Sequence, residues 1–130
     1  SGEFEKLSKV VGLINQSDPE QKYLKDAEII FRNRLTLKND DINDLYSLSV
    51  SQILQRKARE AKNTLNKIIK KDKLNSNPYL AKSIVEIYIF DFKNAYKSIK
   101  KSILLNRNKE IEETLKTVYL ITKILNFKFI

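Results

Sequence analysis

Apolar residues recur along this chain at helical spacing, and the whole pattern returns every 34 residues. Ala27, Ala61 and Ala95 keep that interval, and each has apolar residues three positions before it and four and eight positions after it. Such offsets lie on one face of an α-helix. A fixed period of this length is typical of stacked helical units, none of which can bury its apolar face alone. The sequence therefore predicts a helical repeat protein.

Turn residues mark most of the expected helix ends. The pattern predicts helices at about 4–16, 19–37, 41–55, 58–71, 78–90, 92–105 and 109–126, followed by an irregular tail. No glycine or proline marks the turn at 55–57, so the repeat register alone places it. Pro19 and Pro78 are expected to open helices. The expected N-caps are Asp18, a residue within 39–41, Asn77, Asp91 and Asn108.

The 34-residue period and the small residue at a fixed position resemble the tetratricopeptide repeat, a helix-turn-helix unit. The resemblance rests on the three alanines and on Phe31, Leu65 and Ile99 one turn later. It implies an all-α, right-handed superhelix in a single domain of residues 1–130. The implied parts are three helix pairs (8–41, 42–75 and 76–109) and a closing helix (110–126). The third pair aligns with the others only if its turn is two residues shorter.

The composition argues against catalysis. The chain has no histidine and no cysteine, which removes the usual transition-metal ligands, the commonest general base and any disulfide. Paired carboxylates occur at Asp40-Asp41 and Glu112-Glu113, but both pairs lie at predicted helix starts, where capping explains them. We therefore expect no enzymatic activity, no cofactor and no metal.

The chain lacks membrane and targeting signals. No apolar run reaches the roughly 18 residues of a membrane span, so we expect no span in this fragment. The opening residues 1–4 resemble a cloning remnant and would make the chain part of a longer protein. The absence of cysteine leaves the compartment open, and we expect a soluble, intracellular protein.

In tetratricopeptide arrays the first helices line a concave groove that receives a peptide or a helix. The resemblance assigns to this groove Gln16, Asn43, Tyr46, Val50, Ile53, Lys82, Glu86 and Val118. The family's clamp for a terminal carboxylate is missing. Tyr46, Val50 and Ile53 favour an apolar ligand held as a helix in a groove. The alternative is that these three residues belong to the core.

The net charge of +9 is concentrated in the second and third repeats. The predicted basic face consists of Arg59, Lys62, Lys67, Lys70, Lys93, Lys97 and Lys100. Such a stripe suits nucleic acid, an anionic membrane surface or an acidic protein, but few arginines and little aromatic interleaving argue against base stacking. A solvated lysine face is the simpler alternative. We expect a protein–protein interaction scaffold, with nucleic-acid or acidic-surface binding as the alternative and a purely structural role as a third.

The C-terminal segment is more apolar than a closing helix requires. Leu120, Ile121 and Ile124 spread around the helix away from its predicted inner stripe. A large bare apolar patch marks an interface. The hypothesis is that a second protein chain covers this surface, for example an identical copy in a homodimer. The alternative is that the tail folds back over it.

Overall fold

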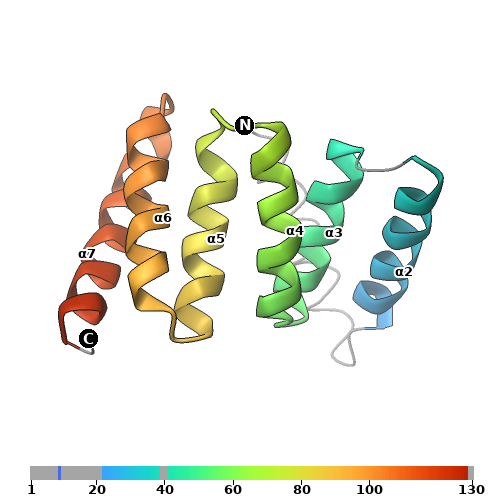
Figure 1. Cartoon of the computed structure of the whole chain (residues 1–130), viewed down its shortest axis with the longest axis horizontal. Coiled ribbons are helices and arrows are strands. Elements are labelled where there is room, and N and C mark those ends of the chain that lie inside the picture. Colours follow the sequence, from blue (N-terminus) through green and yellow to red (C-terminus); the bar gives the residue numbers. More distant parts are fainter. Residues whose placement is uncertain (1–8, 10–21, 39–40, 129–130) are drawn as a thin grey trace.

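The computed structural model describes residue 9 and the ranges 22–38 and 41–128. Over these ranges it contains α2 (Lys22–Leu37), α3 (Ile42–Leu54), α4 (Ala58–Lys71), α5 (Ser76–Tyr88), α6 (Phe92–Leu105), a 3-10 turn η1 (Lys109–Ile111) and α7 (Glu112–Lys128). The helices lie side by side in chain order, from α2 at one end to α7 at the other (Figure 1). The predicted all-α fold of stacked helix pairs is confirmed. The helix predicted at 4–16 and the turn at Asp18 lie outside the described residues.

The helix boundaries keep a constant interval of 34 residues. The helices α3 and α5 begin at Ile42 and Ser76, and α2, α4 and α6 end at Leu37, Lys71 and Leu105. The prediction that the turn of the third pair is two residues shorter is therefore wrong.

The structure also places the cap of α5 two residues earlier than predicted. Asn75, not Asn77, is the N-cap, and its side chain accepts a hydrogen bond from the backbone N–H of Asn77. Pro78 is then the third residue of the helix, where the missing N–H breaks no intrahelical bond.

The turn inside each of the last two helix pairs has the same geometry. Arg56 and Phe90, 34 positions apart, have left-handed φ values of 62° and 59°. The N–H of the next residue, Lys57 or Asp91, donates back to the carbonyl of Gln52 or Glu86 at 2.9 and 2.8 Å. This is the bond pattern of a Schellman motif, which usually has glycine at the left-handed position. The turn at 55–57 thus forms without the residue that normally signals it.

Neighbouring helices in the chain pack against one another. Leu45, Leu65, Ile68 and Val85, together with Ala61, form a core cluster between α3, α4 and α5. Ala61 and Ala95 are completely buried, because a side chain no larger than a methyl group fits where two helices approach closely.

The last helix is longer than predicted. Asn108 does act as a cap, accepting a hydrogen bond from the N–H of Glu110. Helix α7 continues through Asn126 to Lys128, so the irregular tail predicted after 126 is wrong for these positions, where neither glycine nor proline interrupts the helix. Across the described ranges, every helix falls short of the length and hydropathy needed to cross a bilayer.

Candidate protein-interaction site

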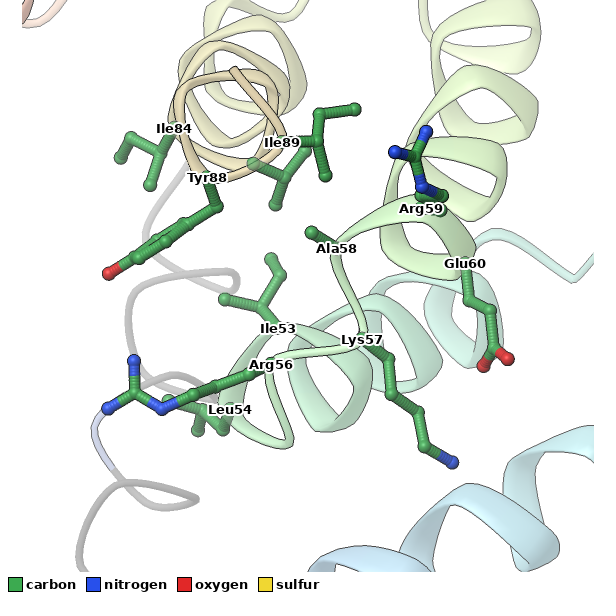
Figure 2. Close-up of a pocket in the computed structure, with 11 residues that line it drawn as sticks. Ile53, Leu54, Arg56, Lys57, Ala58, Arg59, Glu60, Ile84, Tyr88 and Ile89 are labelled. Atoms are coloured by element: carbon green, nitrogen blue, oxygen red, sulfur yellow. The ribbon is translucent and has the colours of Figure 1, made fainter. Parts of the chain in front are cut away.

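A cleft opens between the C-terminal ends of α3 and α5, beside the start of α4. Its volume is about 690 Å³. In Figure 2 the side chains of Ile53 and Ala58 point into this space, which lies below the end of α5 that carries Ile89. The residues that line the cleft are Ile53, Leu54, Arg56, Lys57, Ala58, Arg59, Glu60, Ile84, Val85, Tyr88 and Ile89. A partner bound there would therefore contact both α3 and α5, which are the first helices of two consecutive repeats.

The walls of the cleft are largely apolar and partly open to solvent. Ile53, Ile84 and Ile89 are half-buried, and Tyr88 is 62% exposed. A tyrosine at the mouth of an apolar cleft offers a large contact area with little conformational freedom to lose, the type of residue that dominates protein interfaces. The cleft has the chemistry of a site for apolar side chains of a peptide or helix.

Basic residues form the rim of the cleft near α4. Lys57 Nζ lies 2.7 Å from Oε1 of Glu28 on α2, and Arg32 binds the other carboxylate oxygen of Glu28 at 2.8 Å. Burial by itself raises the pKa of Glu28, but the hydrogen bonds from Lys57 and Arg32 outweigh it and lower that pKa to about 2. The ion pair fixes Lys57, whereas Arg56 and Arg59 are exposed. The rim thus offers positive charge to an acidic flank of a ligand.

Of the predicted groove residues that the structure describes, only Ile53 lines this cleft. Val50 is 2% exposed and Tyr46 8% exposed, so both belong to the interior, as the core alternative anticipated. The Tyr46 hydroxyl donates to Asp72 at 3.2 Å and accepts from Asn75 at 2.8 Å, and burial raises its pKa. This tyrosine fixes the loop between α4 and α5.

Two other predicted groove residues do not line the cleft. Asn43 is exposed in the first turn of α3, and Val118 is half-buried on α7. Gln16 lies outside the described residues. Asn43 and Val118 therefore do not belong to the cleft that Ile53 lines.

Lys82 and Glu86 were placed in the groove through the wrong register of the third repeat. With the constant interval of 34, the counterparts of Tyr46 and Val50 are Leu80 and Ile84. Lys82 is half-buried, and Glu86 is 0% exposed, so its carboxylate has no access to a ligand. Ile84 is the residue that the correct register brings into the cleft.

The predicted basic face is exposed except at one position. Arg59, Lys67, Lys70, Lys93, Lys97 and Lys100 are exposed. Lys62 instead makes ion pairs with Glu86 at 2.8 Å and Asp91 at 3.2 Å. Burial favours its neutral form, but the bond and charge of Glu86 outweigh it and raise the pKa of Lys62. Lys62 is a structural residue and is removed from the candidate basic face.

The same inter-repeat contact occurs twice with its charges exchanged. Glu28 meets Lys57 from the next repeat, and 34 residues later Lys62 meets Asp91. Sequence reasoning missed these pairs. The sequence contains a signal that could have identified them, because each pair joins opposite charges that are 29 residues apart. Both pairs connect consecutive repeats, so the charges serve the stack itself.

A second apolar surface lies at the end of the stack. Leu120, Ile121, Ile124 and Phe127 on α7 are all exposed large apolar side chains. The excess of apolar residues predicted there is therefore at the surface of the described chain.

Among the described residues, no three acidic side chains gather as a metal site would require.

The fold is similar to that of two solved proteins. The type III secretion translocator chaperone SycD of Yersinia enterocolitica superimposes with a TM-score of 0.72 at 16% identity, covering 98% of this chain and 95% of SycD. A chain of a T3SS complex from Aeromonas hydrophila gives 0.71 at 13% identity, covering 96% of this chain and 81% of that one. No protein-family model and no curated protein sequence matches the chain. At these identities the likeness concerns the fold.

Proposed function

We propose that this chain is a non-catalytic protein-interaction scaffold that holds a peptide or helix of a partner protein in the cleft between α3 and α5. The observation that carries the proposal is the partly exposed apolar wall formed by Ile53, Ile84 and Tyr88 at one end of two adjacent first helices. Apolar side chains of a ligand gain free energy there by leaving water.

The comparisons support a protein as the partner. SycD is by name a chaperone for a type III secretion translocator, and the Aeromonas chain belongs to a complex. By analogy, a chaperone-like role toward an apolar client segment fits this chain. The 34-residue helix boundaries and buried Ala61 and Ala95 support assigning the helix pairs to the tetratricopeptide type.

Selection from a random peptide library on the immobilised chain tests the proposal. Selected peptides should carry apolar residues at regular spacing, and their affinity should survive high salt because apolar contacts are not screened. Tyr88→Glu should weaken binding about tenfold or more, as expected for an aromatic anchor. Leu74→Glu is the matched control, since Leu74 is 80% exposed and does not line the cleft.

Two results would contradict the cleft as the site. Peptides that bind the Tyr88→Glu variant as tightly as the parent chain must use another surface. If the chain selects only acidic peptides without apolar residues, and salt abolishes their binding, the basic face is the better candidate.

A further inference from the structure

Helix α7 buries two polar residues on its inward face and exposes three large apolar residues on its outward face. Thr122 is completely buried and Asn126 is 7% exposed, whereas Leu120, Ile124 and Phe127 are 55%, 62% and 69% exposed. A helix that only closes a repeat stack needs the reverse, with a polar outer surface. Exposing three large apolar side chains on one stripe is costly unless something covers them.

The outward residues have the spacing of a helix-pairing seam. Thr117, Leu120, Ile124 and Phe127 follow one another at intervals of three, four and three, which is the alternation of the a and d positions of a heptad. Ile121, also exposed, adjoins the stripe. A seam of this kind accepts the apolar stripe of another α-helix.

One edge of this seam is basic. Lys123 lies on the side of α7 that faces Tyr96 of α6, because Lys123 Nζ is 5.9 Å from the Tyr119 ring and the two tyrosine hydroxyls are 3.5 Å apart. Lys116 lies about two turns earlier on α7 and forms an exposed ion pair with Glu113 at 3.7 Å. Lys100 of α6 extends the edge, with its Nζ 4.8 Å from the Tyr96 ring. The acidic residues Glu112 and Glu113 lie in the first turn of α7, at the opposite end of the helix from Phe127.

We propose that the outward face of α7, namely Thr117, Leu120, Ile121, Ile124 and Phe127, binds an amphipathic helix of a different protein whose apolar stripe is flanked by acidic side chains. The basic edge attracts such a helix and repels a basic one. Pairing α7 with a second copy would bring Lys116 and Lys123 of both copies to one interface, between chains that each carry a net charge of +9. Like charges at an interface disfavour self-association.

The test uses designed peptides as probes on the whole chain. One peptide has leucine along a single helical stripe and glutamate on both sides of it, and a second has lysine in place of each glutamate. Fluorescence anisotropy of the labelled peptides measures both affinities. The glutamate peptide should bind about tenfold or more tightly than the lysine peptide at low salt, and the ratio should fall as ionic strength rises.

Variants locate the binding on α7. Ile124→Glu should weaken binding of the glutamate peptide about tenfold or more, because it places an acidic group in the seam. Lys123→Glu should reduce the preference of the chain for the glutamate peptide over the lysine peptide. Leu37→Glu is the matched control, because Leu37 is 88% exposed at the far end of the stack. Circular dichroism on each variant checks that the helices remain folded. The loss of peptide binding caused by Ile124→Glu should be the same in a Tyr88→Glu background, in which the cleft is altered, so this inference and the proposed function can fail separately.

Four outcomes would overturn the inference. Equal affinity for the two peptides, or unchanged binding to the Ile124→Glu variant, would show that the basic edge and the seam are not the site. A dimer seen by light scattering and dissociated by Ile124→Glu would identify a second copy as the occupant. Sedimentation with phosphatidylserine-containing vesicles, together with no peptide binding, would assign the face to a membrane surface.

Discussion

The ammonium group of Lys62 on α4 lies 2.8 Å from the carboxylate of Glu86 on α5, which is completely buried. The other carboxylate oxygen of Glu86 accepts a hydrogen bond from Ser98 at 2.6 Å. In the preceding repeat, Gln52 takes the place of Glu86 and accepts from Thr64 at 2.7 Å. One position thus carries a neutral amide in one repeat and a carboxylate in the next, and the carboxylate depends on Lys62.

Removing Lys62 should therefore destabilise the fold through the charge it leaves behind. Lys62→Met is expected to cost about 3 kcal/mol, the low end for breaking a buried ion pair, because Glu86 would remain buried without its counter-ion while Lys62 itself is partly exposed. Urea denaturation gives the free energy of unfolding. Lys67→Met, an exposed lysine on the same helix, should be nearly neutral. Adding Glu86→Gln to Lys62→Met should recover most of the loss, and a double variant as unstable as the single one would contradict this account.

Ala61 should tolerate no larger side chain. It is completely buried in the core cluster with Leu45 and Leu65. Ala61→Leu adds volume to a packed crossing and should cost about 1–3 kcal/mol, seen as a lower melting temperature. Asn63→Leu places the same side chain at an exposed position of α4 and should have little effect. If Ala61→Leu leaves the melting temperature unchanged, the helices do not cross at this residue.

The left-handed turn at Arg56 should become more stable with glycine. A residue with a Cβ atom pays about 1–2 kcal/mol in that conformation, whereas glycine adopts it freely but loses more backbone entropy on folding. The expected net gain of Arg56→Gly is about 1 kcal/mol, measured as a higher urea midpoint. Arg56→Val should lower the midpoint, because a branched side chain is least tolerated at positive φ. A loss of stability in the glycine variant would argue against the left-handed geometry.

The stack should weaken in acid through Glu28. Its pKa falls from an ordinary value of 4.5 to about 2 in the folded chain, so the unfolded chain binds the proton more readily. The stabilisation is fully present above the unfolded pKa and is lost as pH falls toward the folded one, from about pH 5 to about pH 2.

Glu28→Gln isolates this contribution. Between pH 6 and pH 3 the parent chain should lose more free energy of unfolding than the variant does, by about 2 kcal/mol at most, since Lys57 and Arg32 remain partly solvated. Guanidinium titrations at the two pH values supply the four free energies required. An equal loss in both chains would mean that Glu28 is not the acid-sensitive group.

How much of this arrangement the sequence predicts can be judged from α4 and the cleft. The range 58–71 was predicted to the residue, because the alanine register and the 34-residue period together place the helix. The faces of the first helices were harder to predict. Helix α3 packs against both α2 and α4, so a single apolar stripe cannot tell which of its residues stay exposed.

The cleft itself was missed for a related reason. Its α5 wall depends on Ile84 and Tyr88, whereas the mistaken two-residue shift predicts Lys82 and Glu86 at these positions. The cap of α5 was misplaced by two residues as well, since Asn75 and Asn77 are both good N-caps and only the fold selects between them. The ion pairs of Glu28 and Lys62 likewise depend on which helices become neighbours.

The exposed lysines of α4 and α6 should bind nucleic acid weakly and without sequence preference. Lys67, Lys97 and Lys100 can reach phosphate groups, which carry no base information, while Lys62 is engaged by Glu86 and Asp91. Dissociation constants of about 10⁻⁴ to 10⁻⁶ M are expected near physiological salt, with a steep dependence on ionic strength. Fluorescence anisotropy with two unrelated RNA sequences of equal length should give the same affinity.

Replacing Lys97 and Lys100 by glutamate should lower the salt slope by about two, in line with two lost phosphate contacts, and Tyr88→Glu should leave it unchanged. Nanomolar binding that distinguishes the two sequences would instead make the basic face the main functional site.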